Sequence, residues 1–204
     1  MAWDTEGTKR KILEAAASEF ARCGPDGTTI ERIAGLAGVN KERVYNYFGG
    51  KTVLFARVLR EQLAAAAENV PAESFATHDI GDYAARLYDY HCEHPELIRL
   101  LQWEALTVEA EVPEEEQRTT FYGRKTAAIQ DGQAAGVLTS ALEPDLLNFL
   151  VTAMAGYWAA MPHVARMMTG SPDDLAAEHA RRRASVAEGA RRLTSPALPP
   201  MSAV

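Results

Sequence analysis

The stretch TTIERIAGLAGVNKERVYNYFGGKTVLF, residues 28–55, decides the fold of the N-terminal part of the chain. Its first half predicts a short helix, because its apolar residues recur at helical spacing. These residues are Ile30, Ile33, Ala34 and Ala37. Thr28 or Thr29 is suited to cap the start of this helix, and Gly38 is suited to stop it. Asn40 is then a good cap for a following helix.

The following helix is predicted over residues 41–48 and ends at the Gly49-Gly50 pair. An upstream helix is predicted over residues 8–22 and ends at Gly24 and Pro25. Three short helices, with a tight glycine-containing turn between the second and the third, indicate a helix-turn-helix. In that motif the last helix enters the major groove of DNA with its N-terminal residues on base edges.

The third predicted helix turns polar and aromatic side chains away from the core. Val44 and Phe48 lie four residues apart and are expected to face inward. Cations suit phosphate or guanine, and phenol hydroxyls suit phosphate oxygens, so the outward face favours contact with DNA. Packing of the tyrosines between helices is the alternative. The outward residues are Lys41, Glu42, Arg43, Tyr45, Asn46 and Tyr47.

Many spaced positions of this region agree at once with one known signature. The chain resembles the DNA-binding part of the tetracycline-repressor (TetR) family over about residues 8–60. The matching positions are Thr29, Ile33-Ala34, Ala37-Gly38-Val39, Tyr45, Tyr47-Phe48 and Lys51. The upstream helix matches at Lys9, Ile12, Ala16, Phe20 and Gly24.

The resemblance implies a role for each matching position. It implies that Thr29, Tyr47 and Lys51 hold phosphates, and that Lys41, Arg43 and Tyr45 face the groove. Asn46 suits either role. The chain departs from the family pattern at Glu42 and Arg43, where small residues and Thr or Ser are common. These two residues either read cytosine and guanine edges, which would give the chain its own operator sequence, or leave Glu42 in a surface ion pair.

The charge of the chain is unevenly distributed along its length. The net charge is −7, yet residues 1–60 carry ten Lys and Arg against seven Asp and Glu. Residues 61–204 carry 11 Lys and Arg against 21 Asp and Glu. A basic head on an acidic body suits a protein that contacts phosphate at one end.

The expected location is the cytoplasm, without a membrane anchor. The N-terminus lacks the basic and apolar pattern of a signal peptide. The most apolar stretch, residues 146–161, is shorter than the roughly 20 residues that a membrane span needs. The two cysteines, Cys23 and Cys92, form no metal-type cluster.

The remainder of the chain predicts further helices, so the fold class is all-α. Pro and Asp residues suit several of their starts, and glycines their ends. We expect helices over about residues 51–70, 80–94, 95–106, 113–136, 144–161 and 171–193. With the family resemblance, which implies a ligand-binding and dimerisation role for the body, the predicted organisation is a helix-turn-helix DNA-binding domain at 1–52, a helical ligand-binding and dimerisation domain at 53–194, and a disordered tail at 195–204.

A homodimer on double-stranded DNA is expected, because one helix reads too few bases and a dimer reads both halves of a palindromic operator. In the TetR family the last two helices usually form a four-helix bundle across the dimer. Residues 145–161 carry more apolar surface than one core face needs. The last predicted helix is rich in alanine, which allows close helix approach.

The helical body is predicted to bind a small, largely apolar effector that releases the operator by shifting the two recognition helices. Aromatic and polar-tipped side chains within its helices are the candidates, with packing in the core as the alternative. The candidates are Tyr83, Leu87, Tyr90, His91, Leu101, Trp103, Phe121, Tyr122, Lys125, Phe149, Met154, Tyr157 and Trp158. Tyr90 or His91, Trp103 and Tyr157 are expected to orient the ligand.

Repression is the expected role, and no cofactor or catalytic activity is predicted. His91 and His94 lie three residues apart on a helix, but no further metal ligand is evident. No nucleophile with a base can be assembled from residue spacing. Two alternatives remain, namely a regulator controlled by a protein partner and a helical small-molecule enzyme or carrier.

Overall fold

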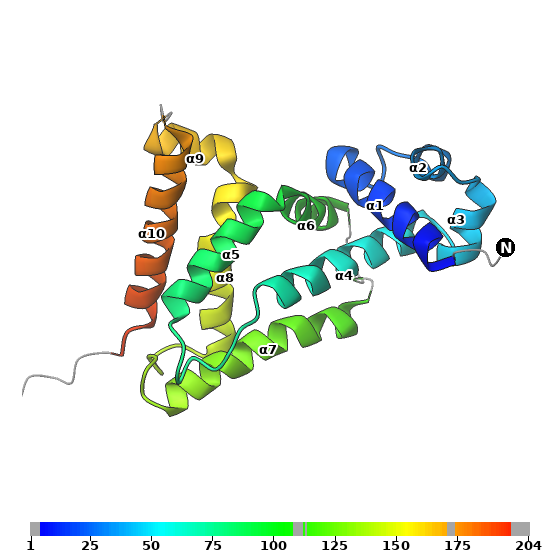
Figure 1. Ribbon diagram of the computed structural model, residues 1–204. Helices are drawn as coiled ribbons and strands as arrows, with labels where there is room; N and C mark the ends of the chain where they lie inside the picture. The colour runs from blue at the N-terminus through cyan, green and yellow to red at the C-terminus, as the bar shows by residue number, and fades with distance from the viewer. Residues whose placement is uncertain (1–4, 108–111, 113, 171–173, 197–204) are drawn as a thin grey trace, which may run out of the picture. The chain divides into compact units, whose positions relative to one another are not determined.

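The described part of the chain is built from helices. The computed structural model describes residues 5–107, 112, 114–170 and 174–196, and no strand occurs among them. The all-α prediction is therefore confirmed, and Figure 1 shows the order of the helices. The helices are α1 (Thr5–Cys23), α2 (Ile30–Ala37), α3 (Lys41–Phe48), α4 (Lys51–Asn69), α5 (Ile80–Glu93), α6 (Pro95–Thr107), α7 (Glu115–Ala134), α8 (Pro144–Ala160), α9 (Pro162–Thr169) and α10 (Leu175–Thr194).

The helices group into two units, which we call the head unit and the body unit. The head unit comprises the chain up to Ala65 together with His94–Arg118. The body unit comprises Ala66–Glu93 and the chain from Thr119 onwards. The helix α6 packs against α1 and belongs to the head unit, whereas the functional division predicted at residue 52 stays a prediction.

The head unit has an apolar core formed by α1 to α4 and α6. Phe20 of α1 meets Phe55 of α4 edge to face, with ring centroids 5.2 Å apart. The ring of Trp103 on α6 lies against Gly24, where a Cβ atom would come within 2.7 Å of it. Gly24 has a φ of 72°, so a glycine serves both the backbone turn after α1 and the close approach of the indole. The largest fully buried side chains here are Phe20, Ile12, Ile33, Leu54, Leu59, Leu97, Leu100 and Val44.

The body unit is centred on α5, which packs against α8 and α10. Gly81 allows the close approach of α5 to α10, because a Cβ atom there would lie 2.7 Å from the carbonyl oxygen of Ala187. Asp89 of α5 accepts from Arg183 (2.6 Å) on α10, and His179 of α10 lies 2.9 Å from the same carboxylate. Buried apolar contact and ion pairs therefore hold the same two helices together.

The structure differs from the predicted helix pattern at a few places. The helix α9 was not predicted; Pro162 takes its first turn and Gly170, with a φ of 86°, follows its end. Asp174 caps α10 through its side chain. Two predicted helix starts, one at Pro113 and one within residues 171–173, lie outside the described residues. The predicted tail lies outside them from residue 197 onwards. Within the described ranges, no helix combines the length and the hydropathy of a transmembrane span.

Candidate nucleic-acid interface

Side-chain hydrogen bonds cap the two helices of the helix-turn-helix in the head unit. Oγ1 of Thr29 accepts from the backbone N–H of Arg32 (3.2 Å) and begins α2. Gly38 ends α2 in the left-handed region, with a φ of 68°. Oδ1 of Asn40 accepts from the backbone N–H of Arg43 (3.1 Å) and begins α3. The predicted caps and turn are therefore present, and they fix the direction in which α3 leaves the turn.

One side of α3 is anchored and the other is open. Val44 is fully buried and Phe48 is half-buried. Lys41, Glu42, Tyr45 and Asn46 are exposed, while Arg43 and Tyr47 are half-buried. Tyr45 keeps 46 % of its surface exposed, which is high for an aromatic residue. The helix thus offers polar and phenolic side chains at its surface, as groove recognition requires.

Neighbouring side chains position three of the predicted contact residues. The ammonium of Lys9 lies 5.9 Å from the centroid of the Tyr47 ring. Lys41 pairs with Glu31 of α2 at 3.2 Å. Nζ of Lys51 donates to the carbonyl of Thr28 (3.4 Å), which places the start of α4 beside the start of α2. The predicted residues therefore gather around α3 and the two helix starts that flank it.

A buried carboxylate that the sequence argument overlooked fixes α2 on α1. Glu19 is 4 % exposed and accepts from Arg22 (3.0 Å), Arg32 (2.6 Å) and Thr28 (3.2 Å). The hydrogen bond from Arg22 is the largest cause that lowers the pKa of Glu19 to about 2, with Arg32 adding to it. Ile12, Ala16 and Glu19 recur at helical spacing, so a carboxylate in this apolar face was the available signal.

Comparison with known proteins covers both units. The sequence profile described as "Bacterial regulatory proteins, tetR family" matches residues 12–58. The profile described as "Tetracyclin repressor-like, C-terminal domain" matches residues 79–192, more than half of the chain. The chain belongs to the TetR family. As a TetR-family protein it is a helix-turn-helix regulator of transcription whose partner is DNA.

Individual relatives agree with membership of the TetR family. The HTH-type transcriptional repressor SCO4008 of Streptomyces coelicolor is 46 % identical over 172 residues, which is 83 % of this chain and 88 % of the relative. The crystal structure of the transcriptional regulator SCO4942 from the same organism superposes with a TM-score of 0.75 at 30 % identity, covering 92 % of this chain and 98 % of that one. The transcriptional regulator FadR from Bacillus subtilis, solved with stearoyl-CoA, has a TM-score of 0.67 at 16 % identity and covers 89 % and 98 %, which supports the TetR fold alone.

The candidate ligand residues fall into three groups in the TetR body and head. Tyr83, Leu87, Tyr90 and His91 are buried on α5. Trp103 belongs to the head unit and packs on Gly24, and Leu101 lies half-buried on the same helix. The remaining candidates lie on α7 and α8. They are Phe121, Tyr122, Lys125, Phe149, Met154, Tyr157 and Trp158.

The structure places the described candidates in different surroundings. Phe149 and Tyr157 are 73 % and 56 % exposed, so their side chains lie at the surface of α8. Trp158 packs between Tyr88 (ring centroids 6.5 Å apart) and the guanidinium of Arg182 (5.1 Å). The expectation that Tyr90 or His91, Trp103 and Tyr157 orient one ligand stays a prediction. Phe121 and Lys125, in contrast, line a common cavity.

Proposed function

We propose that this TetR-family protein is a homodimeric repressor that binds a palindromic operator and is released from it by a small-molecule effector. The observation that carries the proposal is α3, whose buried Val44 anchors a helix with exposed polar and phenolic side chains. The 46 % identity to a protein named as a transcriptional repressor supports the direction of control.

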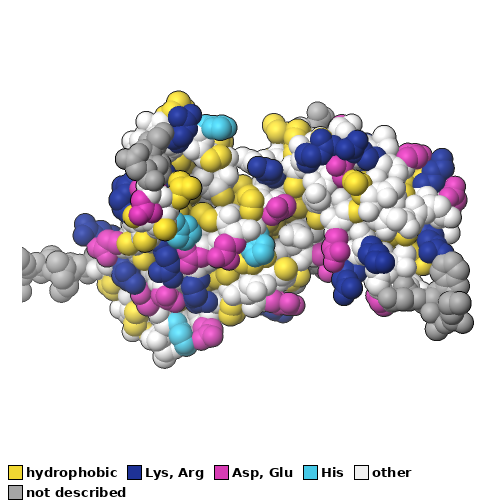
Figure 2. Space-filling view, turned by 45° about the horizontal axis from the view of Figure 1, so that its top comes forward, with side chains coloured by type: hydrophobic (Ala, Val, Ile, Leu, Met, Phe, Trp, Pro, Cys, Tyr) yellow, Lys and Arg dark blue, Asp and Glu magenta, His cyan; other side chains and the backbone are white. Residues whose placement is uncertain are grey.

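The charge of the first 60 residues, with ten Lys and Arg against seven Asp and Glu, supports binding by the α2–α3 region. Lys and Arg side chains lie over the head unit, at the right of Figure 2, interspersed with Asp and Glu. Ion pairs within the head hold Lys41 and Lys51, so phosphate contact requires these cations to exchange carboxylate for phosphate. Each such phosphate contact releases counterions from the DNA, so the affinity for DNA depends on salt.

A second copy of the chain is the proposed occupant of the outer face of α8. Leu146, Phe149, Leu150 and Tyr157 follow helical spacing and keep 41 % to 73 % of their surfaces exposed. Contiguous exposed apolar side chains of this size mark an association surface. The alanine-rich α10 packs beside α8, and several of its alanines are exposed. Two such helices from each copy fit the four-helix bundle that the family resemblance implies.

Operator binding is tested with the full-length protein and DNA that flanks its own gene. Fluorescence anisotropy over a salt series would compare wild type, Arg43→Ala and the control Arg86→Ala, which removes a half-buried arginine from α5. We expect wild type to prefer its operator over unrelated DNA. Arg43→Ala should lose part of that preference, corresponding to about 1–3 kcal/mol for one base contact, while Arg86→Ala retains it.

The outcomes separate base contact from phosphate contact at Arg43. If Arg43→Ala shows a smaller salt dependence than wild type but the same preference for the operator, Arg43 contacts phosphate rather than a base. Weak and sequence-blind binding by wild type to all of this flanking DNA would overturn the proposed function.

A further inference from the structure

Lys125 occupies a position on α7 where an apolar residue is expected. Phe121, Lys125, Ala128 and Ile129 follow helical spacing, and Ala128 and Ile129 are 5 % and 2 % exposed. The side chain of Lys125 therefore faces the same way as the core residues of the body unit. In the described part of the chain, no carboxylate lies within ion-pair distance of its ammonium. A cation so placed is stabilised poorly unless an anion reaches it.

Burial changes the pKa of the Lys125 amine. It lowers the pKa of Lys125 from 10.5 to about 8, and burial is the whole cause of the shift. An ammonium paired with a carboxylate would show the opposite change. The structure thus presents a desolvated cation without its counter-charge.

Lys125 lines a small cavity at the end of α4. The cavity has a volume of about 80 Å³ and lies wholly within the body unit. It is lined by Ala67, Val70, Pro71, Ala72, Phe121, Arg124 and Lys125. Two of these residues are cations, none is acidic, and the others are apolar. The volume suits the charged group of a ligand rather than a whole drug-sized molecule.

His91 does not supply the negative charge that would compensate Lys125. It is 5 % exposed, and its Nδ1 atom has no hydrogen-bond partner among the described residues. Burial and then the charge of Lys125 lower the pKa of His91 to about 4, despite a hydrogen bond with the backbone of Ala155. The imidazole is therefore neutral at physiological pH and tolerates the cation without neutralising it.

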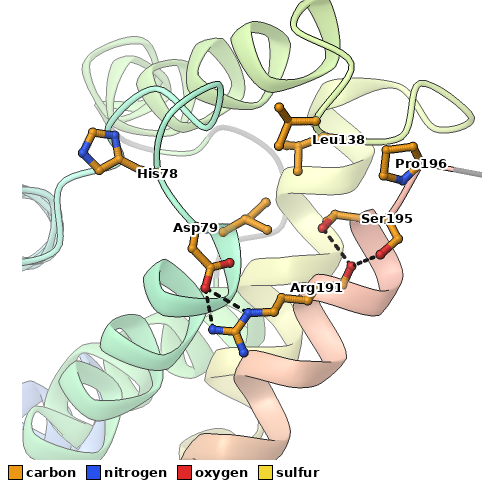
Figure 3. Close-up of a pocket in the computed structure, with 9 residues that line it drawn as sticks. His78, Asp79, Leu138, Arg191, Ser195 and Pro196 are labelled. Atoms are coloured by element: carbon orange, nitrogen blue, oxygen red, sulfur yellow. Dashed lines mark hydrogen bonds and ion pairs between the residues drawn. The ribbon is translucent and has the colours of Figure 1, made fainter.

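A second cavity in the body unit has a cation that is paired with an anion, in contrast to Lys125. It has a volume of about 180 Å³ and lies between the start of α5 and the end of α10. Figure 3 shows the carboxylate of Asp79 turned toward the guanidinium of Arg191, and Nε of Arg191 donates to Oδ2 of Asp79 (2.9 Å). The cation at this cavity already has its anion, so the charge is compensated within the chain.

We propose that the effector of this protein carries an anionic oxyacid group, such as a carboxylate, that binds Lys125 in the cavity at the end of α4. Exposed Arg124 adds a second positive charge at the same cavity, and the apolar part of the ligand packs against Phe121 and Val70. The inference rests on the proposed function, because it names the chemical class of the effector.

Two sets of matched probes test the charge requirement in the full-length protein. One set is decanoate, decanol and decyltrimethylammonium, and the other is benzoate, benzyl alcohol and benzyltrimethylammonium, all below their micelle concentrations. Isothermal titration calorimetry would measure each affinity for wild type, Lys125→Met, Lys125→Arg and the control Lys11→Met, which removes an exposed lysine of α1. We expect the carboxylate to bind best in at least one set. Lys125→Met should weaken it at least about tenfold, whereas Lys125→Arg and Lys11→Met should weaken it less.

Proton uptake gives a readout that a purely structural role of Lys125 would not change. With a pKa of about 8, the free amine is about half protonated at pH 8. An anion raises that pKa, so binding should take up as much as about half a proton. The uptake is measured in two buffers of different ionisation enthalpy, and Lys125→Met should abolish it.

Operator binding, measured on the same samples, separates the two proposals. If operator binding persists but no carboxylate binds better than its alcohol and ammonium counterparts, the anionic class is overturned and the proposed function stands. The same holds if carboxylate affinity and proton uptake are equal in wild type and Lys125→Met. If wild type shows no specific operator binding, the proposed function is overturned. The cavity can then no longer be interpreted as an effector site.

Discussion

Replacement of Phe149 by alanine should dissociate the dimer over a measurable range of concentration. Phe149 is 73 % exposed in a single chain and lies within the apolar face of α8 that we assign to the second copy. A symmetric interface contains each residue twice, so one substitution removes two phenyl rings from the dimer.

The expected size follows from the exposed fraction of the ring. Full burial of a large apolar side chain stabilises by about 1.5–3 kcal/mol. The 73 % that remains for dimerisation to bury corresponds to about 1–2 kcal/mol for each copy and about 2–4 kcal/mol for the dimer. Such a loss raises the dissociation constant of the dimer about 30- to 1,000-fold.

Sedimentation velocity over a dilution series would measure this constant for wild type, Phe149→Ala and the control Leu106→Ala. Leu106 is 76 % exposed but lies on α6 of the head unit, so its truncation removes similar exposed apolar surface from another helix. Operator affinity of Phe149→Ala should fall with the dimer population, while folding, followed by circular dichroism, stays intact. Equal dissociation constants for wild type and Phe149→Ala would refute the assignment of this face to a second copy.

Three further predictions concern local structure. Asn40→Ala removes the α3 cap and should cost about 1 kcal/mol and weaken operator binding, whereas Asn40→Ser should largely preserve both in thermal-melt and anisotropy measurements. Because the folded-state pKa of Glu19 is lowered from 4.5 to about 2, its stabilisation is complete above pH 4.5 and is lost as the pH falls toward 2. Glu19→Gln should remove that part of the acid dependence in urea titrations, and an identical pH profile would contradict the cause. Gly81→Ala should lower the melting temperature by roughly 2–10 °C, because its Cβ would press on the carbonyl of Ala187 at a cost of about 1–3 kcal/mol. A helical Gly35→Ala, with nothing within 4 Å, should not lower it.

Local sequence signals predicted the helix-turn-helix closely, because neighbouring residues determine its helix ends and its turn. The caps at Thr29 and Asn40 and the left-handed Gly38 act within one turn of chain. Helix periodicity likewise predicted the body helices, with ends that differ by a few residues. The helix α9 was not predicted, because it follows α8 directly and, unlike α2 and α3, begins without a capping side chain.

The candidate site in the body could not be predicted as well, because it depends on which faces meet. Periodicity identifies Trp103 and Tyr157 as members of apolar helices, yet one packs on Gly24 and the other stays at the surface. Lys125 was among the predicted ligand residues, but the missing counter-charge emerges only when the surroundings of α7 are known. Close approach of helices from distant parts of the sequence is a tertiary property that no single window encodes.

The acidic character of residues 61–204 limits how an anionic effector can be recognised. With 21 Asp and Glu against 11 Lys and Arg, this region does not attract anions from a distance, and salt screens charges beyond about 8 Å at physiological ionic strength. Recognition must therefore arise locally, where the half-buried Lys125 experiences a lower dielectric than bulk water. Such a site selects acids with an apolar portion, which gain from contact with Phe121 and Val70, over small hydrated anions. The same acidity repels DNA from this region and leaves phosphate contact to the basic first 60 residues. On the proposed function, one uneven charge distribution would serve both ligands: it would restrict DNA to the first 60 residues and make effector binding depend on short-range contacts.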